Sequence, residues 1–589
     1  MTKLANIQHR STVLSLLIVA IGFIVLMLPA IPFGWHQECV MGKCGIFFAD
    51  MYRARDDLWH MSMAQVAFDT FPFRMPIYAG ALLQNYHFLY SLLLGIVTSL
   101  GVSVNFGYYV ALPIIWFTIY TFLTIQIAKK FTSDPKAIPF FLFFSYFSSG
   151  LSYLLSLKNT GSFLNNIGWF SNQPGEYMIN PTLALSLVLF QFLILIVLSG
   201  VRSVKSTVVL LMVIFLLWGS KFYGGVIGVS FIGIYLACTA FEKKIQLKQL
   251  MLLLTGIGLV SLVAIIVFYN PFHSIGKGGV FNLEPFKTIH PMIEDPELFP
   301  LLRVARLRYI LYKNPYIFWP YLALIEYATL LLYITFAYGT RLLSAGLLFM
   351  KEKMSPVLIA LFGSSIIATI FPALFTQKGG DWFNTIQFMA YSQFLMQITL
   401  GLFVYRVSVH NTRNAQIFVG IVLCITLLGT LNPIAEYGRN LPVISKLIPP
   451  KLFQPHVYVS NQELDALLFL SNQEDGVVFT FPFTPIYDTG NVKPLWKTND
   501  TALVAALGNK QVYITNLEQL DLMGIEHTKR TFELKNLNKL NISKLPVQYF
   551  YLQKGHPSYA DFVKRLTPFA TMLYENREVG VWGRNSAEY

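Results

Sequence analysis

Runs of apolar residues, most of them about 20 residues long, follow one another through the first 431 positions of the chain. A helix of about 20 apolar residues crosses the ~30 Å hydrocarbon core of a bilayer. The pattern therefore predicts an α-helical polytopic membrane protein. Eleven spans are expected, at residues 11–33, 107–128, 137–157, 181–201, 207–220, 224–241, 249–269, 316–339, 356–375, 383–405 and 415–431.

After residue 431 the apolar runs shorten to strand length. Strands are expected at 476–481, 511–514, 546–551 and 579–582, and helices at 463–471 and 559–566. Strands that alternate with helices are typical of α/β domains. The sequence thus divides into a transmembrane domain, 1–431, and a soluble α/β domain, 432–589.

The segment 86–104 is also apolar, and the charges of the loops decide how it is placed. If it lies in the membrane interface, the inside loops collect fifteen Lys and Arg residues against Asp134, Glu242 and Glu352. Such loops obey the positive-inside rule. We therefore expect a cytoplasmic (inner) membrane protein with an inside N-terminus, a first exoplasmic loop at 34–106 and a C-terminal exoplasmic domain.

The composition fits this topology and excludes one class of partner. Of the 589 residues, 54% are hydrophobic and 13% are charged, and the mean hydropathy is +0.54. The formal net charge is +14, and the inside loops alone carry +12 of it (fifteen bases less three acids). Topology among membrane lipids accounts for the basic balance, so no nucleic acid partner is expected.

Cysteine gives one local expectation. Cys39 and Cys44 lie in the first outside loop, where a disulfide can persist. Two free thiols, or a metal site that includes His36, are the alternatives.

Candidate chemistry begins in that loop, at the stretch 55–60 with its adjacent Asp56 and Asp57 and with His60. Carboxylates at the bilayer edge are costly to hold without a use. If 52–67 is helical, both carboxylates lie within one turn of His60 and Arg53. The alternative is an interfacial helix whose charges merely face water.

The predicted segments follow one another in this order: a span, a long outside loop with an acidic motif, a segment 85–89 (Asn-Tyr-His-Phe-Leu) that leads into an interfacial helix, many further spans and a C-terminal outside domain. This order resembles that of the GT-C superfamily of membrane glycosyltransferases. The resemblance implies transfer of a sugar from a polyprenyl-phosphate or polyprenyl-diphosphate donor to a glycan, lipid or protein acceptor. It also implies that Asp56 or Asp57 is the catalytic base or a ligand of a divalent cation, Mg²⁺ or Mn²⁺. His60 would position that carboxylate or bind the same metal.

Such a reaction also needs cations at the donor phosphate. Arg303, Arg306 and Arg308 lie in the outside loop before a span, where the alternative role is anchoring to lipid headgroups. Three further loop residues are weaker candidates. Lys378 is expected near the donor phosphate, and Glu176 and Asp381 are further acidic candidates. The alternatives are a Lys378–Asp381 pair that contacts the acceptor or only stabilises its loop, and a plain turn at Glu176.

Two other functions fit a polytopic chain. A transporter or flippase of lipid-linked sugars would favour ionisable residues inside spans and repeated, interrupted helices. A non-catalytic envelope assembly subunit would explain an outer domain. The ionisable residues of this chain lie mostly in loops rather than inside spans, and no repeat is evident, which favours the enzyme.

Overall fold

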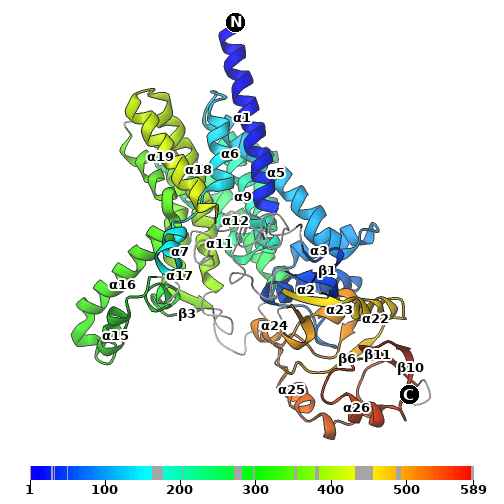
Figure 1. The fold of residues 1–589 in the computed structure, drawn as a ribbon. Helices are drawn as coiled ribbons and strands as arrows, with labels where there is room; N and C mark the ends of the chain where they lie inside the picture. Colours follow the sequence, from blue (N-terminus) through cyan, green and yellow to red (C-terminus); the bar gives the residue numbers. More distant parts are fainter. Residues whose placement is uncertain are drawn as a thin grey trace. The chain divides into compact units, whose positions relative to one another are not determined.

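The computed structural model describes residues 2–27, 31, 33–40, 42–48, 51–161, 177–178, 180–201, 203–270, 281–295, 299–350, 354–377, 384–431, 456–485 and 492–585. The chain forms two compact units (Figure 1). Unit 1 comprises 1–30, 113–267 and 278–452, and unit 2 comprises 31–112, 268–277 and 453–589. The predicted boundary at 432 separates the first outside loop from the C-terminal region, whereas the structure groups the two in unit 2.

Unit 1 is helical, and each of the eleven predicted spans coincides with a helix or, for 137–157, with a helix pair. Helix α18 is almost entirely buried and packs against α6, α17 and α11. The long helices are α1 (Thr2–Met27), α5 (Leu112–Phe131), α6 (Ala137–Phe147), α7 (Ser152–Thr160), α9 (Pro181–Ser199), α10 (Val204–Ser220), α11 (Phe222–Phe241), α12 (Leu247–Tyr269), α16 (Pro315–Tyr338), α17 (Pro356–Leu374), α18 (Gln387–Val409) and α19 (Arg413–Gly429).

In the described part of the chain, eight helices are long and apolar enough to cross a membrane, and the bent pair α6 and α7 makes a ninth candidate. Helices α10 and α19 have 17 residues each, or about 26 Å at 1.5 Å per residue. The segment 86–104 contains α3 (Leu89–Ser99), whose 11 residues extend only about 16 Å. It is too short to cross the bilayer core.

Local sequence signals fix where several of these helices begin. Asn180 precedes Pro181 and accepts a hydrogen bond from the Leu183 amide at 3.1 Å, so it caps α9. Ser203 and Ser206 cap α10 reciprocally.

Unit 2 contains the predicted α/β region. Its five-stranded sheet has the order β10-β11-β9-β6-β8, with β6 parallel to both β8 and β9. The predicted helices coincide with α22 (Asn461–Ser471) and α26 (Tyr559–Leu566). The strands are β6 (Val477–Thr480), β8 (Gln511–Val512), β9 (Tyr549–Gln553), β10 (Ala570–Glu575) and β11 (Val579–Arg584).

A second sheet in unit 2 contains strands from an early and from a late part of the sequence. Its order is β1-β2-β5-β7, with β1 (Gln37–Val40) and β2 (Lys43–Phe48) from the first loop and β5 (His456–Ser460) and β7 (Val492–Pro494) from the C-terminal region. Strand β2 pairs antiparallel with β5. The β1–β2 hairpin carries the Cys39–Cys44 disulfide, which confirms that prediction.

The topology remains a prediction, and cysteine labelling can test it. One of the fifteen counted bases, Arg341, is buried and donates to the Ser148 carbonyl at 2.5 Å, but fourteen inside bases still oppose three acids. In a background without free thiols, an impermeant reagent added outside should label Asp475→Cys and should not label Lys130→Cys. Labelling of Asp475→Cys only from the cytoplasmic side would refute the eleven-span topology.

A buried acid in unit 2 predicts a pH dependence of stability. Glu463, on the first turn of α22, is 1% exposed, and neither of its carboxyl oxygens has a hydrogen-bond partner among the described residues. Burial, assisted by the nearby Glu578 charge, raises the pKa of Glu463 to about 8. The unfolded chain ionises Glu463 near pH 4.5, so between the two values the folded state holds the extra proton.

The contribution of Glu463 to the free energy of unfolding should therefore be highest below pH 4.5 and should fall as the pH rises towards 8, by about 5 kcal/mol in total. Glu463→Gln should flatten this dependence. The thermal midpoint of the purified protein between pH 5.5 and 8.5 measures it, and equal slopes for both proteins would contradict the assignment.

Candidate active site

Helix α2 (Met51–Val66) carries the acidic motif and matches the helix predicted at 52–67. Its two adjacent carboxylates have opposite surroundings. Asp57 is 4% exposed, and His60, one turn later, is 6% exposed. The Asp56 side chain is 63% exposed and lies 3.9 Å from the Arg55 guanidinium. The structure thus brings Asp57 and His60 onto one buried face and leaves Asp56 at the surface.

Two consecutive tyrosines hold the Asp57 carboxylate. Tyr108 donates to Oδ1 at 2.7 Å, and Tyr109 donates to Oδ2 at 2.5 Å. Both belong to a π-helical turn, η2 (Gly107–Ala111), at the start of the span that continues as α5. Such wide turns are rare and recur at functional sites. The two phenols stabilise a charged carboxylate in a buried position, because hydrogen bonds to an ionised acceptor are strong.

A glycine makes room for this arrangement. Gly34 has φ +73°, a backbone conformation that favours glycine, and a Cβ atom there would lie 2.0 Å from Cε2 of the Tyr109 ring. The Gly34 amide donates to the Phe47 carbonyl at 2.8 Å. Gly34 therefore lets the chain pass directly over the ring that donates to Asp57.

His60 extends the network towards α3. Its Nδ1 lies 3.0 Å from the Ser91 hydroxyl, and its Nε2 lies 3.4 Å from the Tyr86 hydroxyl. The His60 ring also stacks on Tyr108, with 6.4 Å between the ring centroids. The imidazole and the Asp57 carboxylate thus share Tyr108 as a neighbour.

Tyr90, on α3, completes the buried cluster. Its hydroxyl is buried and has no hydrogen-bond partner in the described residues. Burial, with the charge of Asp57 as a second cause, raises the pKa of Tyr90 well above 10. A hydroxyl donor without a partner beside a buried carboxylate is a group that a substrate oxygen can satisfy.

Elements from the C-terminal region of unit 2 hold α2 in place. Arg55 forms an ion pair with Glu518, and the Asn499 side chain donates to the Met51 carbonyl at 3.1 Å. Helix α23 (Leu503–Leu507) packs against α2. The acidic helix is therefore positioned by residues that lie 448 to 463 positions away in the sequence.

The described residues do not by themselves form the expected metal site. Within the described ranges, no three His, Cys, Asp or Glu side chains lie close enough together to hold a metal ion. Asp56 is exposed, both Asp57 oxygens accept phenolic hydrogen bonds, and both His60 nitrogens face hydroxyl groups. A divalent cation at this site stays a prediction, and no step below uses one.

The three arginines predicted at the donor phosphate separate into two environments. Arg308, on α15 (Leu302–Leu311), is 2% exposed, pairs with Glu294 and lies 3.6 Å from the Glu326 carboxylate. His290 lies 2.9 Å from the same Glu326. Arg303 and Arg306 are exposed on α15. Because two carboxylates engage Arg308 inside unit 1, we retain only Arg303 and Arg306 as phosphate candidates.

The other predicted site residues, Glu176, Lys378 and Asp381, lie outside the described residues. Lys221, between α10 and α11, is buried and donates to Asn180 Oδ1 at 3.1 Å and to the Thr182 hydroxyl at 3.0 Å.

Sequence reasoning missed the side chains that surround Asp57 and His60. The tyrosines at 108 and 109 lie at the end of a span, where aromatic residues usually indicate only a membrane interface. A pair of adjacent tyrosines was the available signal. Nothing in the sequence pairs it with Asp57, because the π-helical turn that aims both hydroxyls at one carboxylate has no distinctive pattern.

No protein-family model and no curated protein matches the sequence. Solved structures with similarity to this chain include the Archaeoglobus fulgidus oligosaccharyltransferase in complex with Zn and sulfate, at 12% identity and a TM-score of 0.45, over 96% of this chain and 73% of that chain. Its apo form has 12% identity and a TM-score of 0.46, over 98% and 75%. ArnT from Cupriavidus metallidurans bound to undecaprenyl phosphate has 10% identity and a TM-score of 0.41, over 97% and 98%. The function below is argued from this chain's own residues.

Proposed function

We propose that the chain is a membrane glycosyltransferase that moves a sugar from a polyprenyl-phosphate or polyprenyl-diphosphate carrier to an exoplasmic acceptor, with Asp57 as the general base. The supporting observation is the buried Asp57 carboxylate, held by two phenols beside His60 and Tyr90. Buried titratable groups that are ordered by specific donors are typical of catalytic sites.

The chemistry assigns each group one task. The acceptor hydroxyl attacks the anomeric carbon, the bond from that carbon to the phosphate oxygen breaks, and the carrier leaves with the electron pair. The acceptor oxygen then has a proton to lose, and Asp57 takes it. Each carboxylate oxygen has a second lone pair beyond the one that accepts a tyrosine hydroxyl. His60 is the positioning residue, since its ring stacks on Tyr108, which donates to the Asp57 carboxylate.

Asp56 is the second choice for the base. Its exposure gives an acceptor free access, but water competes there with every interaction that would stabilise developing charge. Asp57 is preferred because its surroundings exclude water.

The departing phosphate needs cations, and we assign this task to Arg303 and Arg306. The two are three residues apart on α15 and thus share a helix face. A charge-assisted hydrogen bond to a phosphate oxygen contributes about 1.5–3 kcal/mol. The Arg303→Gln, Arg306→Gln double variant should therefore raise the donor KM at least tenfold, with the fold intact. Arg413→Gln, an exposed arginine at the start of α19, is the control. Unchanged donor kinetics would leave headgroup anchoring as the role of the α15 pair.

Membrane vesicles that contain the protein and a labelled polyprenyl-phosphate sugar test the activity directly. Undecaprenyl phosphate is the carrier to use first. Transfer produces a labelled product without the carrier, whereas a flippase or transporter moves the intact lipid-linked sugar across the bilayer and leaves its glycosidic bond unbroken. An assembly subunit produces neither result.

A further inference from the structure

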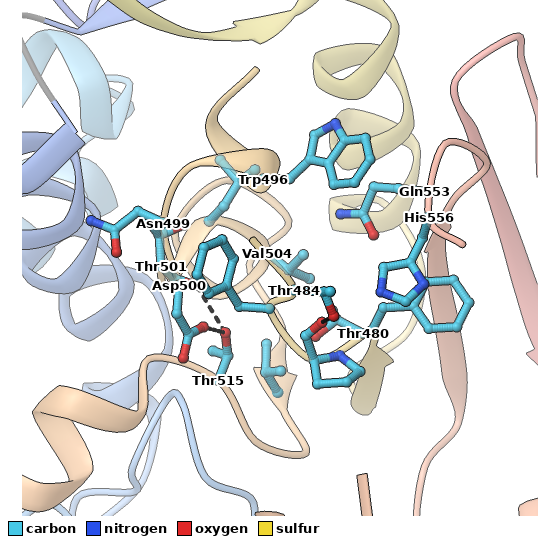
Figure 2. Close-up of a pocket in the computed structure, with 15 residues that line it drawn as sticks. Thr480, Thr484, Trp496, Asn499, Asp500, Thr501, Val504, Thr515, Gln553 and His556 are labelled. Atoms are coloured by element: carbon cyan, nitrogen blue, oxygen red, sulfur yellow. Dashed lines mark hydrogen bonds between the residues drawn. The ribbon is translucent and has the colours of Figure 1, made fainter. Parts of the chain in front are cut away.

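A pocket in the C-terminal region of unit 2 shares no lining residue with the Asp57 network. It is small and open on one side, and β6, α23 and the end of β9 contribute to its wall (Figure 2). Gln553 and His556 lie on one side, and Asp500 and Thr515 lie on the other. No step of the proposed reaction uses these residues.

Three polar groups in this pocket lack hydrogen-bond partners. The Thr480 hydroxyl and the Gln553 amide are on residues only 9% exposed, and no hydrogen bond in the described part of the chain engages either side chain. His556 is 7% exposed, and its Nε2 is likewise unpaired within those residues. Of the three, His556 Nε2 is itself a buried atom, and a buried polar atom normally has a partner, which a ligand or water can supply.

The protonation of His556 defines what that ligand must offer. Burial lowers the pKa of the imidazole, although the nearby Pro482 carbonyl partly opposes the shift without forming a hydrogen bond of acceptable geometry. The ring is therefore neutral at pH 7. Its Nδ1 accepts the Ser558 amide at 3.2 Å, so Nε2 carries the proton and donates into the pocket. Phe481 stacks on the ring with 4.2 Å between centroids and fixes its plane.

The charges of the lining residues favour a neutral ligand over an anionic one. None of the described residues that line the pocket is Lys or Arg. The carboxylate of Asp500 is present, but it accepts hydrogen bonds from the Thr515 hydroxyl at 2.9 Å and from the Asn516 and Leu517 amides at 2.8 and 2.9 Å. A phosphate or carboxylate would meet this negative charge without a cation in the lining. Lys497, whose Nζ lies 5.3 Å from the centroid of the Trp496 ring, is not one of the lining residues. The ligand that fits is neutral and rich in hydroxyl groups.

An aromatic surface completes the site. Trp496 is partly exposed, and Gly555 lies against the edge of its indole, where a Cβ atom would come within 3.1 Å of the ring. A pyranose presents hydroxyl groups around its edge and C–H groups on its faces, and an indole provides the apolar surface that the faces need.

We propose that this pocket binds one neutral sugar unit, through hydrogen bonds from Thr480, Gln553 and His556 Nε2 and through packing on Trp496. The bound sugar belongs to the glycan acceptor, an identification that rests on the function proposed above. Sugar binding itself does not depend on that function.

The test measures binding of free sugars to the full-length protein in lipid nanodiscs, so that no sugar-headed detergent competes. The probes are glucose, galactose, mannose and N-acetylglucosamine, observed by saturation-transfer NMR, with glucose 6-phosphate as the anionic comparison. At least one neutral sugar should bind saturably, and glucose 6-phosphate should bind at least about tenfold more weakly than glucose. Trp496→Ala and Gln553→Leu should each weaken binding about three- to tenfold, from the loss of ring packing and of one or two neutral hydrogen bonds.

Two variants serve as controls. Phe532→Ala removes an exposed aromatic residue of the same region that does not line the pocket, and it should bind as the unaltered protein does. Asp57→Asn should also retain binding. Absence of saturable binding by all four neutral sugars, or binding that survives both pocket substitutions, overturns the sugar site. Loss of transfer in Asp57→Asn with binding retained supports both proposals, whereas binding in a protein that shows no transfer overturns only the proposed function.

Discussion

Asp57→Asn should lower the rate of sugar transfer by about 10²–10⁴-fold. The amide keeps the size of the carboxylate and can still accept a tyrosine hydroxyl, but it cannot take the acceptor proton. Transfer from a labelled polyprenyl-phosphate sugar in membrane vesicles measures the effect. The amount of protein in the membrane and its thermal midpoint show whether the fold survives.

Asp56→Asn is the matched control, because it makes the same chemical change one residue away at a position that is 63% exposed. It should cost much less than the change at Asp57. The reverse order would move the base to Asp56. Full activity in both single variants and in the double variant would remove this pair from the reaction and direct attention to Glu176 and Asp381.

Arg308→Gln should destabilise the lobe formed by α14 (Pro291–Glu294), α15 and α16. The change leaves Glu326, 3% exposed, without its arginine and removes the ion pair to Glu294. Breaking a buried ion pair by removing one partner typically costs about 3–5 kcal/mol. The expected result is a lower thermal midpoint and a reduced amount of folded protein.

Arg306→Gln, on the same helix but exposed, should change the free energy of unfolding by no more than about 0.5 kcal/mol. Its thermal midpoint should therefore stay close to that of the unaltered protein. The pair of variants separates a structural arginine from a ligand-binding one. If Arg308→Gln folds as well as Arg306→Gln and instead raises the donor KM, Arg308 returns to the phosphate site.

The sequence predicted the helices well because spans and amphipathic segments have strong local signals. The predicted 559–566 helix coincides with α26, and 52–67 differs from α2 by one residue at each end. Strand β5 and its pairing with β2 were not predicted, because the two strands lie about 410 residues apart and the sequence of one does not identify the other as its partner.

In the candidate site, too, local signals in the sequence were informative and long-range contacts were not predicted. The motif at 55–60 indicated where chemistry was to be sought, and helical spacing placed Asp57 near His60. The two aspartates differ in burial. The burial of Asp57 depends on α3, the π-helical turn and Gly34, which lie in other parts of the sequence. For Arg308 the spacing rule gave the face of the helix but not its partners, since Glu294 and Glu326 precede and follow it at distances that sequence alone does not connect.

The pairing of β2 with β5 also has a consequence for synthesis of the chain. Phe48 is made about 410 residues before Val457, its partner in the sheet, and at 5–20 residues per second this interval lasts about 20–80 s. During that time β2 has only its hairpin partner, and its other edge offers unpaired amides and carbonyls to any passing strand. The Cys39–Cys44 bridge lies within the hairpin, so both of its cysteines are already made when this interval begins. The early loop therefore depends on a late segment, and a chain cut short before residue 456 would present the acidic helix on an unfinished sheet.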